Sequence, residues 1–143
     1  MIISPLTRSK LLKAFEERNN TVVADMGMFL QSLDVYAQPR CGVTVSDDGL
    51  IYAAFGIVPL WQGVGEAWMV PTVHSKARKV ALGRALRIGF DDLCSELKMH
   101  RVQAAAKVGH NAAHRLLEFV GMKSEGVMHR YGPDGSDFVR YAR

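Results

Sequence analysis

Residues 73–86 read VHSKARKVALGRAL, and they join a predicted strand to the longest predicted helix of the chain. The helix is expected over residues 76–97, because apolar side chains recur there at helical spacing with basic side chains on the opposite face. Arg78 and Lys79 fall near its start, which is an unfavourable place for cations unless an anion binds there. The stretch is therefore either a phosphate-binding turn or a solvated helix start, and its charge favours the first.

Strands are predicted immediately before this stretch. Residues 41–61, CGVTVSDDGLIYAAFGIVPLW, contain two β-rich runs around Asp48-Gly49, a pair that tolerates positive φ and indicates a hairpin turn. A turn at residues 63–65 leads into a further strand over residues 66–73.

The start of the chain predicts three short elements. An apolar strand is expected at residues 1–4, followed by a helix that Thr7 or Ser9 caps and that ends at residues 19–20. A weaker helix is expected over residues 22–33.

After the long helix, the pattern returns to strands. RVQAAAKV, residues 101–108, is almost entirely apolar and predicts a strand buried on both faces. A short helix follows, with Asn111 as its N-cap and Gly121 as the residue that ends it. Two strands then flank residues 133–135. The order β-α-α-β-β-β-α-β-α-β-β indicates an α+β fold with a mixed sheet and crossover helices.

Composition limits the classes of protein that fit. A chain of 143 residues with 48% hydrophobic side chains has the size of one globular domain, residues 1–143. No signal peptide or membrane span is predicted, and two cysteines are too few for a disulfide framework, so a cytoplasmic protein without membrane contact is expected. The sequence contains no Cys/His cluster for a metal, no G-x-S-x-G and no G-x-x-x-x-G-K-[ST], so metal, hydrolase and nucleoside triphosphatase chemistry are disfavoured.

The charge of the chain is positive. Its net charge is +4, and basic residues become frequent from Lys76 onward. This asymmetry favours an anionic partner, either a nucleic acid or a phosphorylated cofactor, although a basic solvated surface is the alternative. Nucleic acid is the weaker choice, because no aromatic side chains alternate with the basic ones along the helix.

Three local sequences resemble the GCN5-related N-acetyltransferase (GNAT) family. Arg78, Ala81 and Gly83 occupy the positions of the family motif R/Q-x-x-G-x-G/A, with alanine in place of the first glycine. GHNAAHRLLEFVGM, residues 109–122, resembles the motif N-x-x-A-x-x-L-Y-x-x-x-G-F, and the last 16 or so residues resemble the family's final strand pair. The resemblance covers about residues 48–143 and implies a central, mixed, splayed sheet of about seven strands flanked by about four helices. Within the family, residues 56–70 look most like small GNAT-type proteins of tailed bacteriophages, including an internal virion protein of short-tailed coliphages.

The resemblance implies a site for acetyl-coenzyme A (or coenzyme A). Backbone N–H groups between strand and helix hold the pyrophosphate in this family, and glycines allow its close approach. The pantetheine arm is expected along the strand end, at Val70 and Val73. The implied phosphate and motif residues are Arg78, Lys79, Val80, Ala81, Leu82, Gly83, Arg84, His110 and Asn111.

The resemblance also implies the reacting groups. Glu66 lies near the position of a catalytic glutamate and is the candidate base for the substrate ammonium, with a solvent-facing role as the alternative; His74 is a second candidate. The family tyrosine that protonates the departing thiolate falls on Leu117, which cannot do so. Tyr131 is the main substitute, and His129 and His114 are others.

Two functions follow as expectations. The first is transfer of an acetyl group from acetyl-coenzyme A to an amine of a protein or small molecule. The second is a catalytically degenerate binding protein, either a phage virion component or a modulator of a host protein, which the substitutions at Ala81 and Leu117 favour. A monomer or a homodimer fits either function.

Overall fold

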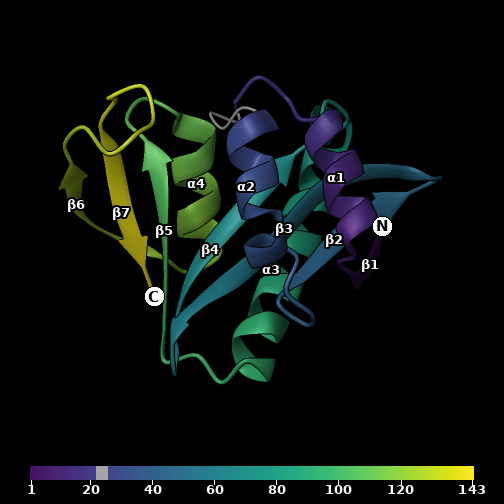
Figure 1. Ribbon diagram of the computed structural model, residues 1–143, viewed down its shortest axis with the longest axis horizontal. Helices are drawn as coiled ribbons and strands as arrows, with labels where there is room; N and C mark the ends of the chain where they lie inside the picture. Colours follow the sequence, from purple (N-terminus) through teal and green to yellow (C-terminus); the bar gives the residue numbers. More distant parts are fainter. Residues whose placement is uncertain (22–25) are drawn as a thin grey trace.

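The protein, described by a computed structural model at residues 1–21 and 26–143, is built on one seven-stranded sheet. The strand order is β1-β2-β3-β4-β5-β7-β6, and every neighbouring pair is antiparallel except β4 and β5, which are parallel. The strands are β1 (Ile2–Pro5), β2 (Gly42–Asp47), β3 (Leu50–Trp61), β4 (Val64–Pro71), β5 (Arg101–Lys107), β6 (Lys123–Met128) and β7 (Phe138–Ala142). The predicted α+β class with a mixed sheet is confirmed (Figure 1).

Four α-helices are present in the described residues, in the predicted order. They are α1 (Arg8–Glu16), α2 (Met26–Tyr36), α3 (Lys79–Glu96) and α4 (Asn111–Phe119), and a 3-10 turn, η1 (Ser75–Arg78), precedes α3. None of them is long and apolar enough to cross a membrane. The helix was predicted over residues 22–33, of which 22–25 lie outside the described residues; α2 covers the remainder and ends at Tyr36, three residues later than predicted.

The helices cover both faces of the sheet. Phe15 of α1 and Phe29 of α2 stack with ring centroids 3.8 Å apart and pack with Ala54 of β3 on one face. On the other face, Leu86 and Phe90 of α3 belong to a second cluster of buried side chains. Burial on this scale stabilises the fold by about 1.5–3 kcal/mol for each large apolar side chain.

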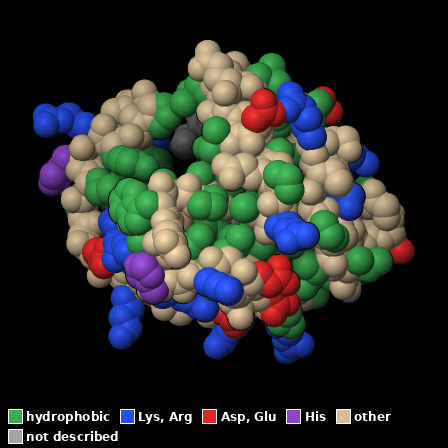
Figure 2. Space-filling view, turned by 60° about the horizontal axis from the view of Figure 1, so that its bottom comes forward, with side chains coloured by type: hydrophobic (Ala, Val, Ile, Leu, Met, Phe, Trp, Pro, Cys, Tyr) green, Lys and Arg blue, Asp and Glu red, His purple; other side chains and the backbone are tan. Residues whose placement is uncertain are grey.

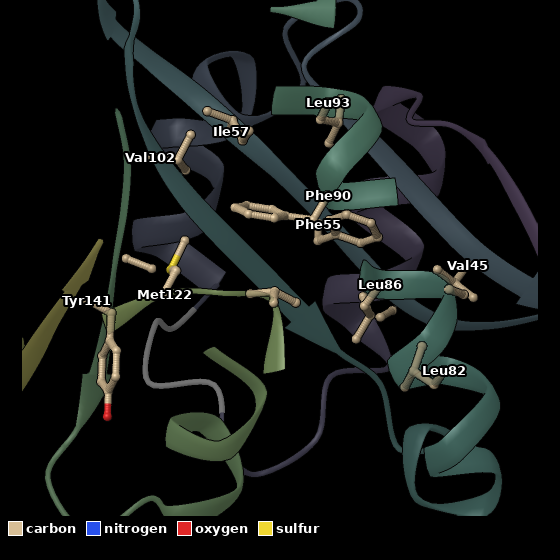
Figure 3. Close-up of a cluster of buried hydrophobic side chains, with 14 of the residues drawn as sticks. Val45, Phe55, Ile57, Leu82, Leu86, Phe90, Leu93, Val102, Met122 and Tyr141 are labelled. Atoms are coloured by element: carbon tan, nitrogen blue, oxygen red, sulfur yellow. The ribbon is translucent and has the colours of Figure 1, made fainter. Parts of the chain in front are cut away.

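The second cluster fixes α3 against the middle of the sheet. Figure 3 shows Leu86, Phe90 and Leu93 directed from α3 toward the strands, where Phe55 of β3 meets them. Gly89 allows this close approach, because a Cβ atom built there would lie 2.7 Å from Cζ of Phe55. The helix start that follows β4 is therefore held in a fixed place above the sheet.

Strands β4 and β5 separate after a short paired segment. Their parallel pairing comprises Val64 with Arg101, Gly65 with Val102 and Glu66 with Gln103. Beyond these pairs β4 continues to Pro71 and β5 to Lys107, and the two strands diverge (Figure 1). The sheet is thus splayed in its centre, as the resemblance implied.

Local predictions agree with the structure at the turns and differ at several element ends: α1 ends at Glu16 rather than at residues 19–20, and α3 begins at Lys79, after η1, rather than at residue 76. Asp48 and Gly49 have φ of 49° and 77° in the β2–β3 hairpin, and Gly121 ends α4 with φ of 90°. The N-cap of α4 is His110, not Asn111, because Nδ1 of His110 accepts the Ala113 N–H at 3.1 Å.

The expected burial of β5 on both faces was wrong. Val102, Ala104 and Ala106 are buried on the α3 and α4 side, whereas the alternate side chains are only half-buried. The reason is that, among the described residues, α1 and α2 pack mainly on β3 and β4 rather than on that side of β5.

Candidate active site

A cavity of about 730 Å³ lies at the opening between β4 and β5. Residues 67–71 of β4 and 104–107 of β5 form its two edges, and side chains of α1 and α2 on one side and of α3 and α4 on the other complete its walls. Figure 2 shows one face of the molecule hollowed, with hydrophobic side chains gathered around the hollow. The divergence of the two strands therefore creates space for an extended ligand through the centre of the fold.

The open edge of β4 is set by its register with β3. Thr72 donates its N–H to Tyr52, so residues 66, 68, 70 and 72 use their backbone groups to pair with β3. The pairing of Glu66 with Gln103 uses the Ala67 N–H, so the C=O of Ala67 and the N–H and C=O of Met69 face the opening, and both residues line the cavity.

This register leaves few unpaired backbone groups at Val70 and Val73, where the pantetheine contacts were predicted. The backbone of Val70 pairs with β3, and the N–H of Val73 donates to the carbonyl of Glu17 at 2.9 Å. The carbonyl of Pro71 already accepts the Asn19 N–H at 3.0 Å. Of Val70 and Val73, only Val70 lines the cavity. The unpaired backbone groups of this edge belong to Ala67 and Met69.

The start of α3 presents part of the predicted phosphate motif to the cavity. Lys79, Leu82 and Gly83 line the cavity, whereas Val80, Ala81 and Arg84 do not. A Cβ atom built on Gly83 would meet only a ring carbon of Phe119, at 4.0 Å. Packing within the protein would therefore allow a side chain at this position. The empty space beside Gly83 allows a ligand to approach the helix backbone closely.

Arg78 is directed away from this wall. Its guanidinium forms an ion pair with Asp47 at the end of β2, and it does not line the cavity. Lys76 and Ser75 of η1 do line it, although the sequence analysis had not singled out either as a site residue. The basic run from Lys76 onward was the signal that could have included Lys76.

Helix α4 forms the opposite wall, and its Leu116 and Leu117 pack against the core cluster while staying partly exposed. No residue between Asn111 and Phe119 is buried, yet Ala113, Leu116 and Leu117 line the cavity. An amphipathic helix normally buries its apolar face; that of α4 lies partly against the core and partly at the cavity, where it can contact a ligand. His110 also lines the cavity, whereas Asn111 does not.

His110 is held as a hydrogen-bond donor toward its surroundings. Because its Nδ1 accepts the Ala113 N–H, the proton of the neutral ring lies on Nε2. Such a ring can donate a hydrogen bond to a phosphate or carbonyl oxygen. The cap residue of α4 therefore adds a donor to the cavity wall.

Glu66 lies where β4 and β5 begin to separate and is held by two partners. Nη1 of Arg140 lies 2.7 Å from Oε1 and 3.0 Å from Oε2, and Nε2 of Gln103 donates to Oε2 at 2.8 Å. A carboxylate offers about four acceptor positions. Three are used here, so the remaining one lies on Oε1.

Aromatic side chains lie near this carboxylate and its partner Arg140. The rings of Tyr36 and Trp68 lie 5.3 Å apart and both line the cavity, while Tyr131 lies under the guanidinium of Arg140 at 5.6 Å. Burial, followed by the nearby Tyr131 and Glu66, raises the pKa of the Tyr36 hydroxyl. Tyr36 is therefore neutral at physiological pH.

Tyr36 and Trp68 were missed in the sequence analysis. Phe29, Leu33 and Tyr36 recur at helical spacing along α2, which was the available signal for Tyr36. The indole N–H of Trp68 is buried and has no hydrogen-bond partner among the described residues. Trp68 therefore offers its ring rather than its N–H to the cavity.

The other candidate acids and bases are placed differently. His74 lies outside the cavity lining, with Nε2 3.6 Å from Oε2 of Glu17. His114 uses both ring nitrogens, one with the Tyr141 hydroxyl at 2.8 Å and one with the Lys107 carbonyl at 2.9 Å. His129 is exposed beside Asp137. Leu117 lines the cavity, where its side chain cannot protonate a thiolate.

Comparisons with known proteins identify the fold. No protein-family model matches the chain, and no curated protein matches it. Solved structures match it over nearly its whole length. Ard1 from Thermoplasma volcanium gives a TM-score of 0.81 at 14% identity, covering 99% of this chain and 95% of that chain.

A GNAT-family acetyltransferase from Streptococcus pneumoniae gives a TM-score of 0.73 at 13% identity, covering 99% of this chain and 97% of that one. The chain has the GNAT fold. A spermidine N-acetyltransferase mutant from Vibrio cholerae shares this fold, with a TM-score of 0.75 at 14% identity over 99% of this chain and 94% of that one. The described residues contain no group of three His, Cys, Asp or Glu side chains that could hold a metal ion.

Proposed function

We propose that the protein transfers an acetyl group from acetyl-coenzyme A to an amine. The observation that carries the proposal is the opening between β4 and β5, where the backbone of Ala67 and Met69 faces a cavity of about 730 Å³. An extended amide-containing arm can add to such an edge as a strand does. The acetyltransferase structures that share the fold support the same activity.

The residues around the cavity fit the parts of acetyl-coenzyme A. Lys76 and Lys79 supply positive charge at the start of α3, and the space at Gly83 allows phosphate oxygens to approach the first-turn N–H groups. Ala67 and Met69 would pair with the pantetheine amides. The apolar face of α4 would cover the same arm from the other side.

Glu66 is the proposed base. When bound, acetyl-coenzyme A supplies the thioester: the amine nitrogen forms a C–N bond to the acetyl carbon, the C–S bond breaks, and the proton lost by nitrogen ends on the sulfur. Before this, the substrate ammonium must lose a proton, because only the neutral amine is nucleophilic. The free acceptor position on Oε1 of Glu66 can receive that proton directly or through water, while Arg140 and Gln103 hold the carboxylate in place.

A binding protein without catalysis is the second candidate. Leu117 lines the cavity at the position that the family resemblance assigns to a tyrosine, and it offers no proton to a thiolate. Tyr131 would have to replace it, but its contacts are with Arg140 and Phe138. This candidate would use the cofactor cavity for binding alone, in a phage particle or on a host protein, as the sequence resemblance to phage proteins suggests.

Calorimetric titration with acetyl-coenzyme A, followed by an assay of thiol release with a panel of amines, tests the proposal. Binding together with amine-dependent thiol release supports the acetyltransferase. Binding without turnover supports the binding protein. An absence of binding at millimolar acetyl-coenzyme A contradicts both uses of the cavity.

A further inference from the structure

Two aromatic rings lie beside Glu66 on the face of the sheet that α1 and α2 cover. Side chains alternate along a strand, so Trp68, two residues after Glu66 on β4, lies on the same face about 6.5 Å farther along. Trp68 and Tyr36 both pack against the buried cluster of that face, and their ring centroids are 5.3 Å apart. Both side chains are only partly buried, and both line the cavity. We call Tyr36 and Trp68 the ring pair.

The position of the ring pair is set by its neighbours. A Cβ atom built on Gly56 of β3 would lie 2.9 Å from Cζ2 of Trp68, so glycine at this position lets the indole ring lie against the strand. The Tyr36 hydroxyl is near enough to Glu66 for the carboxylate charge to raise its pKa, after the larger effects of burial and of Tyr131. The two rings and the proposed base therefore belong to one corner of the cavity.

Aromatic rings in such a corner can attract a cation. The face of an aromatic ring carries partial negative charge, and tryptophan gives the strongest attraction. One contact of this kind is already present, because the guanidinium carbon of Arg140 lies 5.6 Å from the ring centre of Tyr131. Phe15 and Phe29 on the same face differ, since they stack on each other with 1% and 3% exposure and belong to the core. The partly exposed ring pair is the part of this aromatic surface that a ligand can reach.

We propose that the ring pair binds the acceptor as an alkylammonium ion beside Glu66. This inference rests on the proposed acetyl transfer and specifies its acceptor as an aliphatic amine, which is protonated at neutral pH, rather than an arylamine, which is not. The cation lies against Trp68 and Tyr36, and one of its protons passes to the free acceptor position on Oε1 of Glu66. Acetyl transfer to the neutral nitrogen then follows as in the proposed function, and Glu66 returns its proton to water.

The test compares choline with 3,3-dimethylbutan-1-ol, an uncharged molecule of nearly the same shape. Neither can be N-acetylated, so both report binding alone. Each is titrated into isotope-labelled protein, without and with saturating coenzyme A, and the NMR signal of the Trp68 indole N–H is followed. Trp61, at the end of β3 and 67% exposed, gives the internal control, and Trp61→Phe assigns the two indole signals. We expect choline to shift the Trp68 signal and to bind about 3- to 30-fold more tightly than the alcohol.

Two variants of Tyr36 separate the contribution of the ring from that of the hydroxyl. Tyr36→Leu removes the ring and should weaken choline binding at least about threefold. Tyr36→Phe keeps the ring and should bind choline about as tightly as the wild type, because the attraction comes from the ring face. Thermal melting verifies that both variants fold, and the wild-type comparison of the two probes depends on neither.

The outcomes separate the inference from the proposed function. Equal affinity for choline and the alcohol, or shifts confined to Trp61, overturns the inference and leaves acetyl transfer intact. Equal losses of choline binding in Tyr36→Leu and Tyr36→Phe also overturn it, because the hydroxyl rather than the ring would then hold the ligand. If calorimetry detects no binding of acetyl-coenzyme A, the proposed function fails, and the assignment of this site to an acceptor fails with it even where choline binds.

Discussion

Arg140 on β7 binds both carboxylate oxygens of Glu66 on β4, with 2.7 Å from Nη1 to Oε1, across 74 positions of the sequence. The pair crosses β5 at the level where β4 and β5 part, and Gln103 of β5 joins it from between. Both side chains are largely shielded from water, with 18% exposure for Arg140 and 27% for Glu66. The carboxylate is therefore fixed beside the opening rather than free in solvent.

We predict that Glu66→Gln retains acetyl-coenzyme A binding but lowers kcat at neutral pH by ~10²–10⁴-fold, the usual contribution of a positioned base. The loss should shrink as pH rises, because more of the amine is then already neutral. Steady-state kinetics between pH 7 and about 10, where amines titrate, measure the trend. A loss of kcat that stays constant across this pH range would indicate that the ion pair of Glu66 with Arg140 is structural. In that case Arg140→Gln should lower kcat to the same extent.

A second prediction concerns Gly83, where a Cβ atom would not clash with any neighbouring side chain. Gly83→Ala should stabilise the helix by about 0.5–1 kcal/mol, yet weaken acetyl-coenzyme A binding, because the new methyl group occupies the space beside the helix backbone. Chemical unfolding and calorimetry give the two quantities separately.

The control is Gly89→Ala on the same helix. Its Cβ atom would lie 2.7 Å from Phe55, so overpacking should cost about 1–3 kcal/mol of stability. Cofactor affinity of the remaining folded protein should change little, because Gly89 does not line the cavity. Equal affinity of Gly83→Ala and wild type would contradict a ligand contact at Gly83.

The two neighbouring cations at the start of α3 should behave differently. Lys79→Ala should weaken acetyl-coenzyme A binding by about 1.5–3 kcal/mol if Lys79 makes a charged hydrogen bond to the cofactor. Arg78→Ala should leave affinity nearly unchanged, because Arg78 is paired with Asp47 outside the cavity. Calorimetry on both variants makes the comparison, and a larger effect at Arg78 would restore the expectation from the sequence motif.

The loop between β6 and β7 should loosen in acid. Hydrogen bonds from the Arg130 N–H and then from His129 lower the pKa of Asp137. A depressed folded-state pKa stabilises the loop above the unfolded value of about 3.9, and this stabilisation is lost as pH falls through the folded pKa. The amide NMR signal of Arg130 should therefore shift between about pH 4 and lower values.

Asp137→Asn is the matched control for this titration. Its side-chain oxygen can still accept the Arg130 N–H, but it carries no charge to lose. The Arg130 signal should then be nearly insensitive to acid. A shift of equal size in this variant would assign the acid response to another group, such as Asp134, whose pKa hydrogen bonds from Ser136 and Lys107 also lower.

The order of the elements could be predicted because each depends on local periodicity and turn residues. Asp48-Gly49 and Gly121 fix two chain reversals through positive φ, and α3 carries a clear apolar stripe. The cap of α4 could not be assigned by residue preference alone, because His110 competes with Asn111 for the position.

The site depended on contacts that no local pattern contains. Glu66 was a sequence candidate, but its partner Arg140 lies 74 residues away and reaches it through the order of strands in the sheet. Arg78 matches a motif position, but the ion pair with Asp47, 31 residues earlier, turns it from the cavity. Such pairings depend on tertiary structure, and a single sequence gives no access to them.

Only three residue pairs in the described strands join β4 to β5, so this short paired segment connects two larger units of the sheet. On one side, β1 to β4 form an antiparallel meander, and on the other, β5 and β6 both pair with β7. Small rotations of the two units about this paired segment would widen or narrow the opening between β4 and β5 without unfolding either unit. A ligand bound along Ala67 and Met69 would connect the two units. Its binding should therefore slow amide hydrogen exchange in both units together.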